Sequence, residues 1–202
     1  TVTAITHKSN AIMPSIISQV TPSESSVIKR VAYEPMYLNH LRNNLSLKCV
    51  KKVSLHEPLT NIRKVLFVQL EKGTSRTEVW RALNGASMLR ADSGKYVIAI
   101  DQDIDPDNAD SVFWALAYRA NPIEDMQILP HRARGHGPKA KDGPSEDSTL
   151  LIDATMKGDM PPLALPKKEY MEHAKEIWER LQLPSLTPQS PWHGYGMGHW
   201  SD

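Results

Sequence analysis

Four aspartates alternate along one short stretch, and their spacing is the first feature of the sequence that could support chemistry. Asp101, Asp103, Asp105 and Asp107 follow an apolar run. Carboxylates at alternating positions can supply oxygen ligands to a hard cation, but the glycine and glutamate of a calcium-binding loop are missing here. The structural alternative is that these carboxylates cap the next helix, accept hydrogen bonds from backbone amides and pair with arginine or lysine.

A second candidate is the densest set of hydrogen-bond donors in the sequence. Its members, interleaved with glycine and proline, are His131, Arg132, Arg134, His136 and Lys139. Arginine and lysine recognise carboxylates or phosphates, and histidine can hydrogen-bond a phenol or transfer a proton. No phosphate-loop motif is present, so the segment predicts either contact with a small substrate or a solvated basic loop.

A strand and the helix after it must position the aspartates. Residues 96–100 are apolar and largely β-branched or aromatic, which is typical of a buried central strand. Asn108 or Asp107 can cap the following helix. The expected buried face of this helix contains Val112, Phe113, Leu116 and Ala117. In parallel α/β sheets ligands usually bind at the carboxyl ends of the strands, where Asp101 would lie.

The rest of the chain alternates between strand and helix patterns. Further strands are predicted at 50–56, 64–70, 126–129 and 149–153, with a weak one at 1–6. Further helices are predicted from about Ser23, with an interruption at Pro35, and at 75–90 and 167–183. This order predicts an α/β fold: a three-layer mixed sheet with helices on both faces, followed by an extended C-terminal tail.

Composition limits the classes of partner. The 202 residues carry a formal net charge of +1, which gives no reason to expect nucleic acid or an anionic membrane as a partner. The single cysteine, Cys49, excludes an internal disulfide and fits a reducing compartment, so a cytoplasmic location is expected. No run approaches transmembrane length, and no signal peptide is evident. Because the sequence begins with Thr1 and not Met, we expect a processed chain or a piece of something longer.

Several segments, in order along nearly the whole chain, resemble the UbiD family of reversible decarboxylases. They are Ala4–His7 with Ile12 and Pro14, Val97–Asp105, Val112–Arg119 with Asn121, Pro122 and Asp125, and Leu151–Thr155 with Lys157. The helical segment His173–Leu181 is similar to the family's C-terminal helix. The ending Pro191–Tyr195 most resembles the branch that acts on hydroxybenzoates and catechols.

The resemblance implies an enzyme longer than this chain. A prenylated FMN with Mn²⁺ and K⁺ would be held mainly by a part that precedes Thr1, and the catalytic arginine and glutamates would belong to that part. No catalytic residue is therefore expected in this chain. The implied division is a remnant of the preceding split-barrel domain and linker at 1–22, the α/β C-terminal domain at 23–166, and a C-terminal helix with a docking tail at 167–202.

The resemblance also implies residues that face the flavin and the substrate. The apolar walls around an aromatic ring would be Ile12, Met13, Ile128 and Leu129. His131 or His136 would hydrogen-bond a ring hydroxyl or the departing carboxylate. The substrate would be a small aromatic, phenolic carboxylic acid that loses carbon dioxide through an adduct with the flavin. The other implied partners are the N-terminal part of the same enzyme and further copies in a homo-oligomer.

Two other classes of function stay open. The chain alone would be an inactive assembly module if the catalytic residues all lie outside it. A magnesium-dependent transferase would instead use Asp101, Asp103 and Asp105, and it would require metal binding by the isolated chain.

Overall fold

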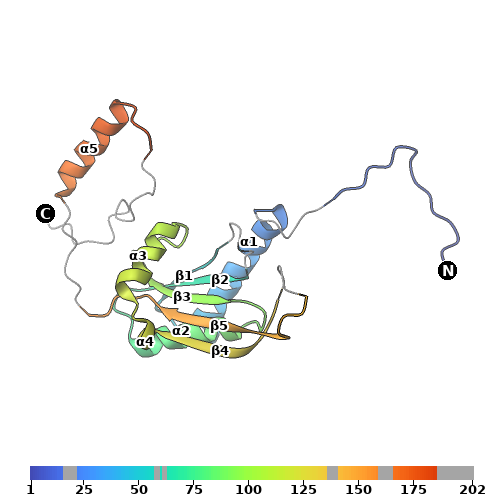
Figure 1. The fold of residues 1–202 in the computed structure, drawn as a ribbon, viewed down its shortest axis with the longest axis horizontal. Helices are drawn as coiled ribbons and strands as arrows, with labels where there is room; N and C mark the ends of the chain where they lie inside the picture. Colours follow the sequence, from blue (N-terminus) through green and yellow to red (C-terminus); the bar gives the residue numbers. More distant parts are fainter. Residues whose placement is uncertain (16–21, 57–59, 61–62, 136–140, 159–165, 186–202) are drawn as a thin grey trace.

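A five-stranded mixed sheet forms the centre of the protein in the computed structural model, which describes residues 1–15, 22–56, 60, 63–135, 141–158 and 166–185 (Figure 1). The strands are β1 (Val50–Leu55), β2 (Val65–Leu70), β3 (Tyr96–Asp101), β4 (Met126–Ala133) and β5 (Glu146–Asp153). Their order is β1-β2-β3-β5-β4, and the central three are parallel. The two edge strands, β1 and β4, run antiparallel to their neighbours. The predicted central position of the strand that begins at Tyr96 is confirmed.

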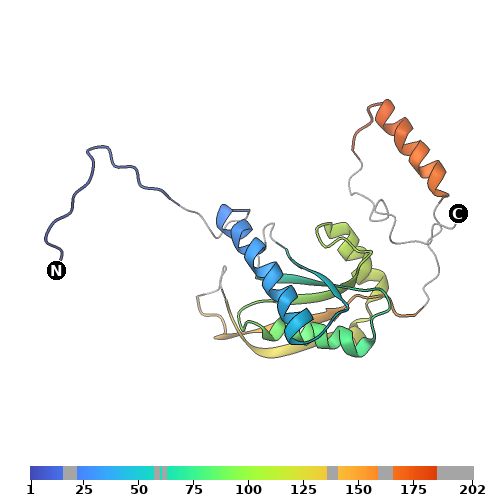
Figure 2. The same ribbon diagram turned by 180° about the vertical axis from the view of Figure 1, so that it is seen from behind.

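Helices lie on both faces of the sheet, which confirms the predicted three-layer α/β fold. One face is covered by α1 (Glu24–Asn39), its π-helical continuation η1 (His40–Asn44) and α2 (Arg76–Met88), as Figure 2 shows from behind. The other face carries α3 (Ala109–Arg119), with the single turn α4 (Pro122–Asp125) after it. A fifth helix, α5 (Lys168–Arg180), stands away from the sheet in both views. The last residues of the predicted tail, 186–202, lie outside the described residues.

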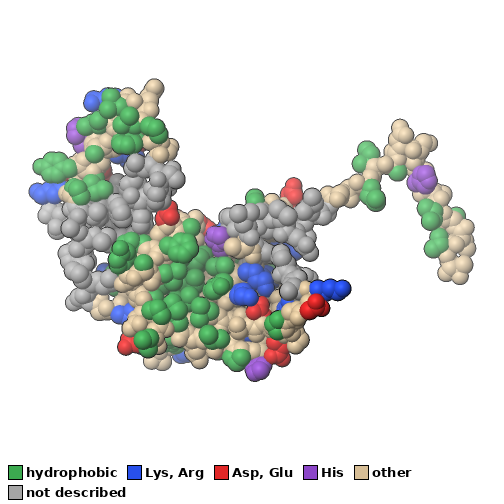
Figure 3. Space-filling view, viewed as in Figure 1, with side chains coloured by type: hydrophobic (Ala, Val, Ile, Leu, Met, Phe, Trp, Pro, Cys, Tyr) green, Lys and Arg blue, Asp and Glu red, His purple; other side chains and the backbone are tan. Residues whose placement is uncertain are grey.

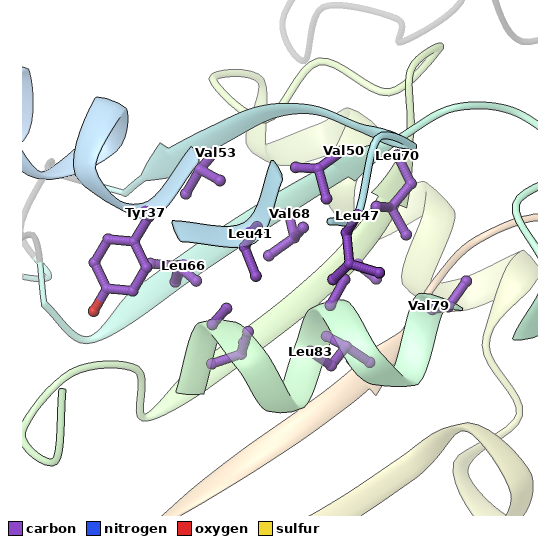
Figure 4. Packing of buried hydrophobic residues seen from close by; sticks show 14 of the residues in the cluster. Tyr37, Leu41, Leu47, Val50, Val53, Leu66, Val68, Leu70, Val79 and Leu83 are labelled. Carbon is purple, nitrogen blue, oxygen red and sulfur yellow. The ribbon is translucent and has the colours of Figure 1, made fainter. Parts of the chain in front are cut away.

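The larger apolar core fills the space between the sheet and the helices α1 and α2. Leu66 and Val68 of β2 point toward Leu41 of η1 and Leu83 of α2, and Tyr37 closes one end of this layer (Figure 4). All five side chains are almost completely buried. Removing this much apolar surface from water supplies the main driving force for folding, at about 25 cal/mol per Å².

Local capping explains where three of the helices begin. Ser23 forms a capping box with Ser26 at the start of α1, and the Ser75 side chain accepts a hydrogen bond from the Glu78 amide at the start of α2. Asn108 caps α3 by accepting from the amides of Asp110 and Ser111. The predicted start of the first helix near Ser23 is confirmed, and Asn108 is the cap of the two residues, Asn108 and Asp107, that the sequence suggested.

Other local predictions were wrong. Residues 1–6 form no strand and are exposed, because a strand needs a neighbour to satisfy its backbone groups. Pro35 lies inside α1 without interrupting it, since burial of Tyr37 and Leu41 beyond it offsets one missing backbone hydrogen bond. The donor-rich segment is not entirely a loop, because β4 continues through Pro130 to Ala133.

Candidate functional site

The predicted apolar wall residues are not gathered into one pocket within the described chain. Ile12 and Met13 lie in the N-terminal segment and are 93% and 88% exposed. Ile128 and Leu129 are neighbours in β4, so their side chains point to opposite faces of the sheet. Leu129 packs against the core beside α2, whereas Ile128 is 67% exposed. Their contribution to a pocket completed by other residues stays a prediction.

His131 stands at an irregularity of β4. The pairing of β4 with β5 shifts register between Leu129 and Arg132, and His131 takes a left-handed backbone conformation with φ of 59°. Its imidazole projects into solvent, and Nδ1 lies 2.6 Å from Oε2 of Glu146 on β5. His136 lies outside the described residues. The proposed substrate contact of either histidine therefore stays a prediction.

The carboxyl ends of β3 and β5 hold a cluster of buried charges centred on Arg119 of α3. Its guanidinium donates to both carboxylate oxygens of Asp103, at 2.9 and 2.6 Å, and to Oδ2 of Asp101 at 3.2 Å. The Trp114 ring lies 5.2 Å from the guanidinium carbon. The backbone amide of Met156 donates to the same Asp101 oxygen at 2.6 Å. These contacts confirm the structural interpretation of Asp101 and Asp103.

Lys157 extends this charge cluster to neighbouring elements. Its Nζ lies 3.3 Å from Oδ1 of Asp153 and 3.2 Å from Oδ2 of Asp125, and it donates to the carbonyls of Arg119 and Asp153. Arg76 of α2 reaches the other oxygen of Asp125 at 2.9 Å. The charge cluster thus connects α2, α3 and α4 to the ends of β3 and β5.

The pKa values of two aspartates in the charge cluster are shifted in opposite directions. Burial raises the pKa of Asp101 to about 6, and the nearby charges of Asp103 and Asp153 act in the same direction. The Met156 amide and Arg119 oppose this shift without cancelling it. Burial alone would also raise the pKa of Asp125, but hydrogen bonds from the Asn121 amide and Lys157 lower it below its ordinary value.

The carboxylates of the charge cluster are engaged by cationic side chains and a backbone amide. Among the described residues, no three histidine, cysteine, aspartate or glutamate side chains are placed to hold a metal ion. The other two aspartates of the alternating run are also engaged: Asp105 accepts from the Asp107 amide, and Asp107 pairs with Arg30 and Lys52. The magnesium-dependent transferase therefore finds no support in the described part of the chain.

Sequence reasoning assigned no role to Arg119, Lys157 or Asp125, although all three lie in the segments that carried the family resemblance. The sequence did offer a signal for these residues, because each charged side chain lies beside apolar residues inside the predicted α/β domain. What the sequence lacked was the pairing, since Asp101 and Arg119 are 18 positions apart.

A small cavity lies at the opposite, amino-terminal end of the parallel strands. It is lined by Lys64, Gly94, Arg132, Asp147 and Thr149, among others, and has a volume of about 10 Å³. That volume accommodates about one water molecule, so this cavity does not fit a flavin ring.

No helix in the described part of the chain is both long enough and apolar enough to cross a membrane.

Comparison with known proteins identifies the class of this α/β domain. Residues 26–154, well over half of the chain, match the family described as 3-octaprenyl-4-hydroxybenzoate carboxy-lyase C-terminal domain. The fold is thus that of a carboxy-lyase C-terminal domain. The chain belongs to the UbiD family, as the sequence resemblance predicted.

Curated relatives match the chain over only part of their own length. The gallate decarboxylase of Lactiplantibacillus plantarum is 26% identical over 176 residues, which cover 79% of this chain and 34% of the relative. A phenolic acid decarboxylase of Escherichia coli O157:H7 is 36% identical over 61 residues, 30% of this chain and 13% of the relative. The chain therefore spans about a third or less of the length of these relatives.

Solved structures share the fold. The UbiD-class enzyme HmfF from Pelotomaculum thermopropionicum, in complex with FMN, superposes with a TM-score of 0.62 at 23% identity, over 75% of this chain and 34% of that one. The vanillic acid decarboxylase of Sedimentibacter hydroxybenzoicus in its closed form gives 0.57 at 20% identity, over 79% of this chain and 34% of that one.

Proposed function

We propose that the chain is the C-terminal part of a reversible decarboxylase that acts on an aromatic, phenolic carboxylic acid with prenylated FMN. The observation that carries this proposal is the family match over residues 26–154. The names of the relatives support the substrate class, since they include gallate, phenolic acid and vanillic acid decarboxylases. The flavin is supported by HmfF structures described with FMN and with prFMN.

The cofactors would be held by the rest of the enzyme. The described residues do not by themselves fit a flavin, because the predicted pocket residues are dispersed and the cavity beside Thr149 is too small. Prenylated FMN, Mn²⁺ and K⁺ are therefore proposed for the part that would precede Thr1, together with the catalytic arginine and glutamates. Bound prenylated FMN supplies an electron sink for decarboxylation.

This chain would contribute part of the substrate pocket and its lid. Residues 1–22 would connect the pocket to the α/β domain at 23–166, with Ile12 and Met13 as apolar walls. Ile128 and Leu129 would add walls from β4, and His131, whose side chain is exposed beside the register shift, would contact a substrate hydroxyl or carboxylate. Such residues orient the acid and keep water out while the carbon–carbon bond breaks.

The experiment requires the complete enzyme, expressed with the coding region upstream of Thr1 and loaded with prenylated FMN. Carbon dioxide release is measured with gallate, vanillate and 3,4-dihydroxybenzoate. His136→Ala is expected to lower turnover while leaving the flavin spectrum unchanged. His40→Ala, on η1, is the matched control. Flavin-loaded enzyme that releases no carbon dioxide from any phenolic acid would contradict the proposed activity, and unchanged kinetics would remove His136 from the site.

A second candidate is an inactive assembly domain, and the dispersal of the predicted pocket residues favours it for the chain alone. Intact-mass analysis and an absorbance spectrum of the chain purified from its native source, together with any polypeptide bound to it, separate the two. A second polypeptide that carries a flavin and co-purifies is the outcome expected if the chain is part of a working decarboxylase. A colourless single polypeptide without decarboxylase activity is the outcome expected for the assembly domain. A bound flavin and measurable turnover would contradict it.

A further inference from the structure

A bulge in β4 determines which side of the sheet His131 faces. Leu129 pairs with Thr149 of β5, and the next pair along the strands is Arg132 with Asp147. Two residues of β4 therefore lie opposite one residue of β5. In a regular strand, positions 129 and 131 would point to the same side. With the extra residue, Leu129 and Arg132 both contact the α2 side of the sheet, and His131 points to the other side.

The buried side chain of Arg132 fixes the backbone beside the bulge. Its guanidinium donates to the carbonyls of Ser87 and Arg90 at the carboxyl end of α2, where a cation also complements the helix dipole. It donates to Oγ1 of Thr149 at 3.2 Å as well. This anchor holds the chain next to His131, whose backbone takes the left-handed conformation.

Glu146 of β5 determines which imidazole nitrogen of His131 carries hydrogen. Nδ1 of His131 lies 2.6 Å from Oε2 of Glu146. An ionised carboxylate only accepts hydrogen bonds, so Nδ1–H must be the donor. In a neutral imidazole the other nitrogen, Nε2, then keeps a lone pair that can accept a hydrogen bond.

The same bulge brings His131 to the face of the sheet that carries Ile128, one of the predicted apolar walls. Ile128 pairs with Leu150, which packs against the core beneath α3, and Glu146 lies four residues before Leu150 on the same side of β5. Figure 3 shows this side of the domain, with an apolar area in the middle and charged side chains to its right, toward the hairpin of β4 and β5. The arrangement suits an aromatic ring that contacts Ile128 while its hydroxyl reaches Nε2 of His131.

We infer that Glu146 is a positioning residue that holds His131 with Nε2 free to accept a hydrogen bond from a ring hydroxyl of the substrate. The inference deepens the proposed function, because it rests on the phenolic substrate proposed there. A site built to hydrogen-bond a substrate hydroxyl discriminates against an acid that lacks this hydroxyl. Glu146 itself contacts neither substrate nor flavin in this arrangement and acts only through His131.

The simpler interpretation is a surface ion pair that holds the hairpin together. Exposed pairs of this kind contribute little to stability. Glu71 and Lys51 form such a pair elsewhere, with 3.0 Å between Oε2 and Nζ, and the Glu71 side chain is 56% exposed against 59% for Glu146. Glu71 therefore serves as the matched control, because it lacks a histidine partner.

The first test is solid-state nitrogen-15 NMR of the complete enzyme labelled at histidine, at pH 8 and without flavin or substrate. His131→Gln identifies the signals of that imidazole by their loss. The parent should show hydrogen on Nδ1 and none on Nε2, and Glu146→Ala should populate the form with hydrogen on Nε2. Glu71→Ala should leave the spectrum unchanged. A parent with no hydrogen on Nδ1, or with hydrogen on both nitrogens, would overturn the inference.

The second test is the kinetics of the flavin-loaded enzyme with 3,4-dihydroxybenzoate. A hydrogen bond that is present both in the bound substrate and in the transition state mainly affects KM. Glu146→Ala should therefore raise KM by about 10-fold and change kcat by less than about 2-fold, whereas Glu71→Ala should change neither. In a His131→Ala background the effect of Glu146→Ala should disappear, because Glu146 acts through that side chain.

An unchanged KM, or an equal effect of Glu146→Ala in both backgrounds, would also overturn the inference. Circular dichroism checks the folding of each variant, and Glu146→Ser replaces Glu146→Ala if the latter fails to fold. An enzyme that releases no carbon dioxide from any phenolic acid contradicts the proposed function. The NMR spectrum needs no activity, so it decides separately whether Glu146 positions His131.

Discussion

Helices α2 and α3 lie on opposite faces of the same sheet, and different forces hold them there. The apolar side chains that α2 buries are Val79, Ala82, Leu83 and Ala86. Helix α3 completely buries only the small apolar side chains of Val112 and Ala115, while its Arg119 is enclosed among aspartates. Helix α2 is attached by apolar area, whereas α3 combines apolar contacts, including Trp114 and Leu116, with a directed ionic contact.

The two kinds of attachment require different amounts of contact area. Attachment through apolar area requires broad coverage, because its strength is proportional to the surface removed from water. Attachment through one guanidinium and two carboxylates requires little area, because the hydrogen bonds fix position and direction. Helix α3 can therefore be held at the carboxyl end of the strands with fewer buried apolar side chains than α2.

The largest effect is expected when the ionic attachment of α3 is removed. Arg119→Met leaves Asp101 and Asp103 without their cation and should lower the free energy of unfolding by about 3–5 kcal/mol at pH 7. Urea denaturation at pH 7 measures the loss. Arg119→Lys is the control, because it keeps the charge without the two-pronged contact to Asp103 and should lose less. Equal stability of Arg119→Met and the parent would show that α3 is held by apolar contacts after all.

A similar but smaller loss is expected in the core beneath α2. Leu83→Ala opens a cavity beneath α2, where Leu83 is fully buried among the strands, and should lower the free energy of unfolding by about 3 kcal/mol. Met88→Ala, at the exposed end of the same helix, should change it by less than about 1 kcal/mol. Denaturation of both variants under one set of conditions gives the comparison. A Leu83→Ala loss no greater than that of Met88→Ala would contradict the described packing.

The third prediction concerns pH and the charge cluster. Burial raises the pKa of Asp101 to about 6, so the folded protein binds its proton more tightly than the unfolded chain. The stabilising contribution of the protonated form is complete below about pH 4 and is lost as the pH rises through 6. Asp101→Asn imitates the neutral acid. The stability of this variant relative to the parent should therefore increase between pH 4 and 7, by up to about 3 kcal/mol.

Taking the difference between variant and parent isolates Asp101 from other carboxylates. Four other aspartates have lowered pKa values, so their contribution to stability increases as the pH rises: Asp92, Asp107, Asp125 and Asp147. Because both proteins contain them, their contribution cancels in the difference. The measurement is urea denaturation at intervals across this pH range. A constant difference would mean that Arg119 keeps Asp101 ionised throughout.

Elements specified by neighbouring residues were predictable from the sequence. The apolar run before Asp101 and the capping residue Asn108 identify β3 and the start of α3 without reference to any distant residue. The helical period identified part of the buried face of α3, since Val112 is buried and Leu116 packs against the core. It was wrong for Phe113, which is 69% exposed, and for Ala117, which is also exposed. It could not anticipate that distant carboxylates would bury Arg119.

Elements specified by distant pairing were harder to predict. Pro130 and the surrounding donors indicated a loop, yet β4 continues past them because Arg132 and Ala133 pair with Asp147 and Glu146 of β5. The same limitation applies to the candidate site. Its members come from the N-terminal segment and from β4, and neither local pattern nor composition specifies what completes the pocket between them.

The smallest effect is expected at Ile128 of β4, and it sharpens the contrast with Leu83. Ile128→Ser removes a side chain that is already 67% exposed, so it should change the free energy of unfolding of the monomer by less than about 0.5 kcal/mol. The measurement is urea denaturation under the conditions used for Leu83→Ala. A loss as large as that of Leu83→Ala would place Ile128 in the domain's own core and remove the contrast between the two positions.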